Sequence, residues 1–143
     1  MTAIADTGLL VAFLYSRDAF HRRAVGEFER AQAPFATCEA VLAEAAHLLT
    51  GRGVPRDRVA GLVTAGAVRV TFEFQREATA VRSLLERYAD TPMDWADACL
   101  VRMTELVAAV EVVTVDSDFL IYRRHGSQAI PVRMPPERTQ RAT

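Results

Sequence analysis

The sequence predicts an α/β fold in three layers, with a central, mostly parallel sheet flanked by helices. Short apolar runs of strand length alternate with segments of helical periodicity along the whole chain, which is the pattern of parallel βα units. The 143 residues, half of them hydrophobic, suffice for one domain with a substantial core. Because no linker, repeat or low-complexity segment divides the chain, we expect one domain over residues 1–133.

The first half of the chain contains two expected strands and four expected helices. Phe20, Ala24 and Phe28 recur at helical spacing, and Gly51 to Pro55 closes a second periodic segment. The expected elements are a strand at 2–5, a helix at 9–15, a helix at about 20–31, a strand at 35–37, a helix at about 41–49 and a helix at about 56–64.

The second half continues the alternation. Val110 to Val115 is the clearest strand, because four of its six residues are valine. The expected elements are a strand at 67–71, a helix at about 81–88, a helix opened by Thr91-Pro92 and running to about 108, a strand at 110–115, a short helix at 119–124 and a strand at 129–132. Residues 134–143 have turn composition, and we expect them to form a loose tail.

Composition excludes several classes of function. All 17 basic residues are arginine, against 18 acids, so the formal net charge is −1. Without lysine the chain has no Walker-type phosphate loop and no Schiff-base chemistry. The two cysteines, Cys38 and Cys99, form no CxxC motif, which favours a reduced compartment. The longest apolar run, 9–15, is too short for a membrane span, and the first residues lack the charges of a secretory signal; we therefore predict a cytoplasmic protein without membrane association.

Two acids follow expected strands. Asp6 ends the strand at 2–5, and Asp116 follows the strand at 110–115. Each is also explained as the N-cap of the helix that comes next, since Asp is a favoured cap. Asp118 is a plausible first-turn acid beside that helix dipole.

Two further acids lie at the edge of apolar helix faces. Glu44 borders a stripe of aliphatic residues, and Glu44-x-x-His47 matches half of a di-iron signature; no second Glu-x-x-His occurs, so the ligand count rules that site out. Asp94 and Asp97 share a helix face at i, i+3. Asp94 is explained by capping if Thr91 is the N-cap, whereas Asp97 lies too far inside the helix for capping.

These acids predict a metal site if the first and fourth strands are parallel neighbours. Two carboxylates 5 Å apart repel by about 3 kcal/mol at an effective dielectric of 20. A cluster of Asp6, Glu44, Asp97 and Asp116 must therefore hold protons or a cation. Oxygen ligands without His or Cys select Mg²⁺ or Mn²⁺ over zinc, and such a site activates water for phosphodiester hydrolysis.

Four motifs in order resemble the PIN domain, and in particular the VapC-type ribonuclease toxins of bacterial toxin–antitoxin pairs. They are Ala-Asp-Thr-Gly-Leu-Leu, Val-Leu-Ala-Glu, Pro-Met-Asp-Trp-Ala-Asp-Ala and Val-Thr-Val-Asp-Ser-Asp-Phe, and the resemblance spans residues 3–132. It implies that Asp6, Glu44, Asp97 and Asp116 hold Mg²⁺ or Mn²⁺ and carry catalysis. Asp94, Asp118, Thr7 and Thr114 match positions that are polar in some members and are secondary candidates.

The resemblance also implies partners: an RNA substrate, a cognate antitoxin protein and a second copy of the chain in a homodimer. Without the four proposed ligands, the net charge of −1 becomes +3. Three arginine groups are candidates for phosphate contacts: Arg22-Arg23, the cluster Arg52, Arg56 and Arg58, and Arg123-Arg124. Trp95 is read as a packing residue or as an aromatic that stacks a base. A non-catalytic RNA- or protein-binding module and a DNA nuclease remain alternatives.

Overall fold

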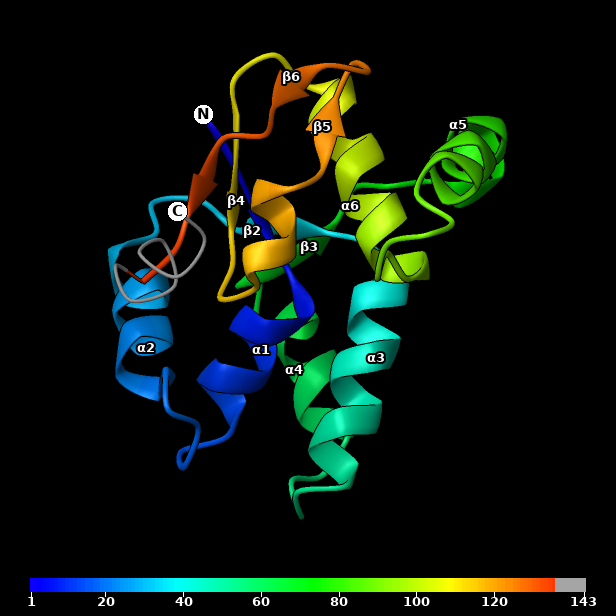
Figure 1. Ribbon diagram of the computed structural model, residues 1–143. Helices are drawn as coiled ribbons and strands as arrows, with labels where there is room; N and C mark the ends of the chain where they lie inside the picture. The colour runs from blue at the N-terminus through cyan, green and yellow to red at the C-terminus, as the bar shows by residue number, and fades with distance from the viewer. Residues whose placement is uncertain (136–143) are drawn as a thin grey trace.

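A five-stranded parallel sheet forms the centre of the computed structural model, which describes residues 1–135. The strand order is β3-β2-β1-β4-β7, and every neighbouring pair is parallel (Figure 1). The strands are β1 (Thr2–Ala5), β2 (Phe35–Thr37), β3 (Val68–Val70), β4 (Val110–Val113) and β7 (Val132–Arg133). The predicted α/β class and the parallel sheet flanked by helices are therefore confirmed.

Within residues 1–135, six α-helices flank this sheet (Figure 1). α1 packs against α2 and α3, α5 packs against α6, and α3 also contacts α6. Their bounds are α1 (Thr7–Leu14), α2 (His21–Arg30), α3 (Glu39–Thr50), α4 (Asp57–Thr64), α5 (Phe74–Arg87) and α6 (Trp95–Leu106). In the described part of the chain, no helix has the length and hydrophobicity that crossing a bilayer requires.

The register of β1 and β4 positions the polar residues at one edge of the sheet. Ala5 pairs with Val113 in a parallel ladder, so the residues that follow them, Asp6 and Thr114, emerge side by side. β1 is the central strand, and its last two residues, Ile4 and Ala5, are buried because helices cover it. The Thr37 hydroxyl donates to the Ala5 carbonyl at 2.9 Å and ties β2 to the same end of β1.

The helix expected at 92–108 is shorter than predicted. Thr91 is not its N-cap, because the Thr91 hydroxyl donates to the Tyr88 carbonyl at 2.8 Å and so completes the turn that follows α5. Asp94 is the N-cap instead: its carboxylate accepts from the backbone N–H of Asp97 at 2.8 Å. α6 therefore begins at Trp95 and ends at Leu106, and the assignment of Asp94 to the first turn was wrong by three positions.

The segment after β4 also differs from the prediction. The helix expected at 119–124 is a single 3-10 turn, η1 (Ser117–Leu120), and Arg123–Arg124 forms strand β5. β5 pairs with β6 (Gln128–Ala129) in an antiparallel hairpin whose turn places His125 and Gly126 at positive φ, 51° and 83°. The expected strand at 129–132 is consequently divided between β6 and β7, and the strand expected at 110–115 ends at Val113.

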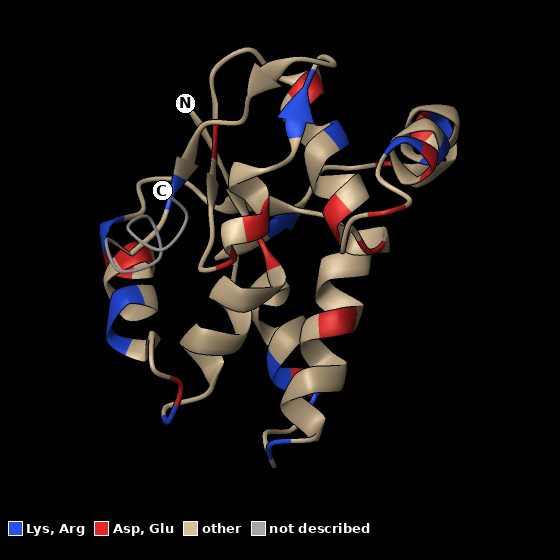
Figure 2. Cartoon of the chain, viewed as in Figure 1, with Lys and Arg blue, Asp and Glu red and all other residues tan. Residues whose placement is uncertain are grey.

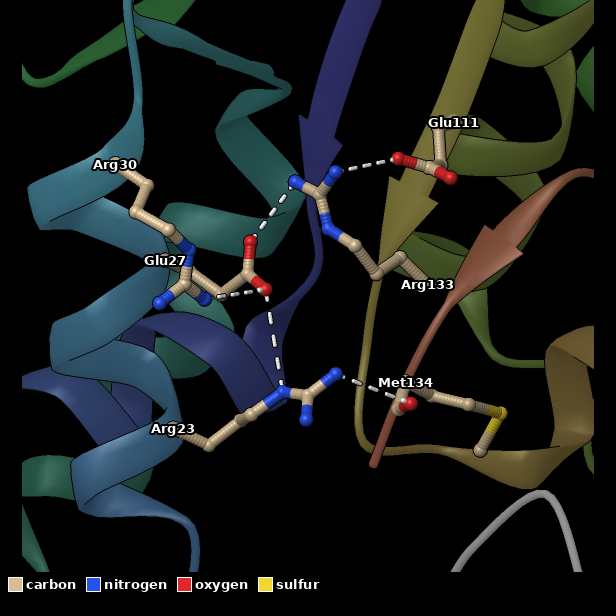
Figure 3. A network of polar contacts seen from close by, with 6 residues as sticks. All are labelled: Arg23, Glu27, Arg30, Glu111, Arg133 and Met134. Atoms are coloured by element: carbon tan, nitrogen blue, oxygen red, sulfur yellow. Dashed lines mark hydrogen bonds and ion pairs between the residues drawn. The ribbon is translucent and has the colours of Figure 1, made fainter. Parts of the chain in front are cut away.

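An ion-pair network around Glu27 joins α2 to the edge strand β7 (Figure 3). Glu27 is only 4% exposed, and its carboxylate lies 2.8 Å from the Arg133 guanidinium and 3.4 Å from that of Arg30. Arg133 also contacts Glu111 at 2.7 Å, and Arg23 donates to the Met134 carbonyl. Met134, the first residue of the expected loose tail, is buried; residues 136–143 of that expectation lie outside the described residues.

We predict that Glu27→Ala lowers the free energy of unfolding by about 1–3 kcal/mol. The substitution removes the buried carboxylate that pairs with the guanidinium groups of Arg30 and Arg133, and these charges are then left without their partner. Urea unfolding measures the loss. Glu29→Ala is the matched control, since Glu29 is exposed on the same helix. Equal stability of both variants and the wild type would show that the network does not hold β7 in place.

Candidate active site

The four predicted ligands line one cavity at the carboxyl edge of the sheet. Asp6 and Asp116 come from the ends of β1 and β4, Glu44 from α3 and Asp97 from α6. Asp94 also lines this cavity, whose volume is about 420 Å³. In Figure 2 the acidic segments at the start of α1, in η1 and at the start of α6 lie near one another, and basic residues lie on α2 and beyond the end of α3. The structure therefore brings together acids that are up to 110 positions apart in the chain.

Asp6 has two structural tasks at the floor of this cavity. One carboxylate oxygen accepts from the Leu9 N–H at 2.9 Å and caps α1, as the capping interpretation predicted. The other accepts a hydrogen bond from the Thr114 hydroxyl. Burial raises the pKa of Asp6 to about 7, and the negative charges of Asp116 and Glu44 add to the rise although both hydrogen bonds oppose it.

Asp97 lies in the first turn of α6, because the N-cap is Asp94 and not Thr91, so the prediction that Asp97 lies too far inside the helix for capping was wrong. Its burial raises its pKa to about 7, and the charge of Asp94 contributes in the same direction. The Tyr122 hydroxyl donates to Asp97 at 2.9 Å and opposes the rise. Asp6 and Asp97 therefore both retain protons near neutral pH when no cation compensates their charge.

Glu44 and Thr7 face each other across the first turn of α1. Burial, followed by the charge of Asp94, raises the pKa of Glu44, whereas a hydrogen bond from Thr7 lowers it. Thr7 lines the cavity together with Gly8. A Cβ at Gly8 would lie 2.7 Å from Val115 Cγ2, so only glycine lets the start of α1 pack this closely against the end of β4.

Asp116, Thr114 and Asp118 form a connected chain after β4. The Asp116 N–H donates to the Thr114 hydroxyl at 2.8 Å, and Asp116 in turn caps η1 by accepting from the Asp118 N–H at 2.9 Å. Burial raises the pKa of Asp118, with the charge of Asp116 as the next cause. Asp118 and Thr114 are not among the residues that line the cavity. They contact residues that do, since the Thr114 hydroxyl donates to Asp6 and the Asp118 N–H donates to Asp116.

The donor set fits a hard divalent cation by its chemistry. Every polar side chain that lines the acidic end of the cavity offers oxygen. Three of the acids, Asp6, Glu44 and Asp97, have a raised pKa, chiefly because they are buried and further because neighbouring carboxylates repel their charge. Within residues 1–135, however, no three Asp, Glu, His or Cys side chains meet closely enough to form a preassembled metal-binding group. The acids share a cavity without being fixed in coordination geometry.

Tyr122 near the site was not predicted correctly. It was assigned to a short helix, yet it is fully buried and positions Asp97; nothing in the sequence near 122 indicates that contact. The packing interpretation of Trp95 is confirmed in part, because its ring lies 5.1 Å from the Phe74 ring while 54% of the residue stays exposed.

We predict that Tyr122→Phe lowers the activity of this site about tenfold at pH 7, with recovery at pH 9. Without the hydroxyl, the pKa of Asp97 rises further above 7, and fewer molecules carry the Asp97 carboxylate. A pH–rate profile measures the shift. Tyr88→Phe removes a neighbouring hydroxyl that accepts from the Arg123 N–H and touches no acid. If both variants keep the wild-type pH profile, Tyr122 does not tune Asp97.

Comparison with known protein families identifies one match. The family model described as PIN domain matches residues 3–124, which include every acid named above. No curated protein matches the chain.

Proposed function

Because the chain belongs to the PIN domain family, whose members are generally metal-dependent nucleases, we propose that it is a Mg²⁺- or Mn²⁺-dependent endoribonuclease. We further propose that it acts as the toxin of a type II toxin–antitoxin pair in the cytoplasm, as a homodimer silenced by a cognate antitoxin protein. The observation that carries the nuclease proposal is the convergence of carboxylates from four separate segments on one cavity.

Asp6, Glu44, Asp97 and Asp116 are the proposed metal ligands and catalytic residues, with Asp94 as a further oxygen donor on the same cavity. When bound, a divalent cation supplies an activated water and neutralises charge on the scissile phosphate. Two hydroxyl groups orient the carboxylates that would hold the cation: Thr114 donates to Asp6, and Tyr122 donates to Asp97. Asp6 and Asp97 release their protons near pH 7, so the site reaches full negative charge at neutral to basic pH.

A nucleic acid is favoured as the substrate by the charge outside the site. The chain without the four proposed ligands carries a formal charge of +3, which suits a polyanion. The exposed aromatic ring of Trp95, which follows Asp94 in the chain and lines a separate pocket with Phe74, suits an unpaired base, because stacking on an aromatic is the usual contact with single strands. Both features support a single-stranded nucleic acid as the substrate. The experiment below distinguishes RNA from DNA.

The test is cleavage of a panel of single-stranded RNAs and of DNAs of the same sequence, with Mn²⁺, with Mg²⁺ and with EDTA. We expect internal cleavage of RNA that requires the cation. Cleavage of DNA alone would make the protein a DNA nuclease. Tight RNA binding with every substrate intact in fresh Mn²⁺ would make it a non-catalytic binding module.

A further inference from the structure

One arginine lies in the acidic cavity, and the structure separates it from the other candidate arginines. Within residues 1–135, Arg52 is the only basic residue that lines the cavity with Asp6, Glu44 and Asp97. It comes from the turn that follows α3, where its backbone N–H donates to the Leu49 carbonyl at 2.9 Å. The positively charged guanidinium of Arg52, in a cavity lined with carboxylates, is placed to bind an anionic ligand that extends beyond the proposed metal site.

Of the other predicted arginines, Arg23, Arg123 and Arg124 make structural contacts, and Arg22, Arg56 and Arg58 are exposed and do not line the cavity. Arg124 is 7% exposed and donates to the Val107 carbonyl, and Arg123 donates to three carbonyls of the segment 120–122. Arg23 belongs to the Glu27 network. Arg56 is exposed on the loop beyond Arg52, outside the acidic cavity. These contacts leave Arg52 as the guanidinium that both faces the site and retains its donors.

The Arg52 guanidinium is held in place by two contacts that leave its hydrogen-bond donors unused. It lies 3.7 Å from the Asp18 carboxylate and over the Tyr15 ring, 5.5 Å from the ring centroid. Asp18 is itself fixed, since it accepts from the Phe20 N–H at 2.8 Å. Within the described residues, the guanidinium makes no hydrogen bond, so its forked N–H groups are available to a phosphate.

Glu44 and Arg52 lie along one wall of the cavity. Glu44, Leu48 and Arg52 all line the cavity and are spaced four residues apart along one side of α3 and the turn after it. The six residue steps from Glu44 to the end of α3 at Thr50 advance the backbone by about 9 Å, more than the width of one phosphate group. With backbone positions this far apart, Arg52 can hold an anion that neighbours the reacting group.

We propose that Arg52 binds a backbone phosphate of single-stranded RNA that flanks the phosphate cleaved at the acids, and so positions the strand along the cavity. The inference rests on the proposed function for its substrate. The proposal selects Arg52, among the candidate arginines, as the one that contacts the nucleic acid at the site. Arg52 is a positioning residue in this proposal, since its guanidinium touches the strand away from the reacting atoms.

The test compares Arg52→Gln, Arg52→Lys and the control Arg69→Gln, which removes the same charge from the exposed face of β3. Binding of a fluorescent single-stranded RNA and of DNA of the same sequence is measured by anisotropy in Ca²⁺ at several salt concentrations. For Arg52→Gln we expect about tenfold weaker binding and a salt slope smaller by about 0.7, the loss of one phosphate contact to a single strand. In cleavage assays KM rises about tenfold while kcat stays within about twofold, and Arg52→Lys recovers part of the affinity.

Each outcome decides the proposal. Equal affinity and salt slope for Arg52→Gln and wild type would overturn it, and so would equal losses in Arg52→Gln and Arg69→Gln, which would indicate a general charge effect. Arg56→Gln is measured in the same way, and equal losses in Arg52→Gln and Arg56→Gln would assign the contact to the whole loop and overturn the single-residue site. If wild type binds oligonucleotides but cleaves none, the proposed function fails, and the binding losses of Arg52→Gln and Arg69→Gln still decide the Arg52 contact. If wild type binds neither RNA nor DNA, both fail.

Discussion

Asp97→Asn is expected to abolish cleavage and to stabilise the metal-free protein at the same time. The loss of activity should be roughly 10²- to 10³-fold, the size typical of removing one charged group from a site built on electrostatic stabilisation. The amide preserves the volume of Asp97, and its oxygen still accepts from Tyr122. Cleavage rates under single-turnover conditions with Mn²⁺ measure this effect directly.

The stabilisation follows from the raised pKa of Asp97. An Asp ionises at 3.8 in the unfolded chain and at about 7 in the folded protein, so the folded state binds the proton more tightly. The unfolding free energy of the wild type therefore falls as pH rises from about 4 to about 7. The full shift corresponds to about 4 kcal/mol, and screening by solvent at this partly exposed residue reduces it to about 1–2 kcal/mol. In EDTA at pH 8 we expect Asp97→Asn to raise Tm by about 3–6 °C, and at pH 4 to leave Tm unchanged.

Asp90→Asn is the matched control, because Asp90 is exposed and does not line the cavity. It should keep both the activity and the pH dependence of Tm. Wild-type cleavage by Asp97→Asn would remove Asp97 from the catalytic set. A lower Tm of this variant at pH 8 would show that Asp97 is not under repulsive strain in the folded state.

Mn²⁺ is expected to stabilise the protein strongly at pH 8 and weakly at pH 5. A ligand at 100 times its Kd adds about 2.7 kcal/mol of stability, which is about 6–10 °C in Tm for a domain of this size. At pH 5 protons compete for Asp6 and Asp97, whose pKa values are about 7, so the same cation concentration adds little. Thermal unfolding with and without Mn²⁺ at the two pH values measures the difference.

Trp95 provides a second measure of this binding. It is the only tryptophan, and it lies between Asp94 and Asp97 in the chain, so a paramagnetic ion at the acids should quench its fluorescence. Quenching should saturate at pH 8 and weaken in Asp97→Asn. Equal stabilisation by Mn²⁺ at pH 5 and pH 8, with unchanged Trp95 fluorescence, would place the cation away from the acids.

The convergence of the acids was predictable because it follows from topology. Asp6 and Asp116 each come after an apolar strand, and strands joined by helices run parallel, so their ends share one edge. Glu44 and Asp97 were recognisable as acids that border apolar faces without a complete local explanation. Family membership covers the same residues, and the catalytic roles of these acids stay predictions.

The positioning residues were not predictable from local patterns. Tyr122 reaches Asp97 because the chain turns after η1 into the β5–β6 hairpin, whose signal is the single glycine Gly126. The wrong N-cap in α6 has a similar cause: Thr91 and Asp94 are both good caps three residues apart, and the turn that ends α5 decides between them. Arg52 was one of several equivalent arginines until the fold placed it in the cavity that the acids line.

The order of the strands along the chain has a consequence for partial products of the protein. β1, the central strand, precedes the other four strands, whereas its neighbour β4 and the Tyr122 contact lie after residue 109. A polypeptide without these residues still carries Asp6, Glu44 and Asp97, but it lacks Asp116, the Thr114 hydroxyl at Asp6 and the Tyr122 hydroxyl at Asp97. Under the proposed function, we therefore expect such incomplete products to leave RNA intact.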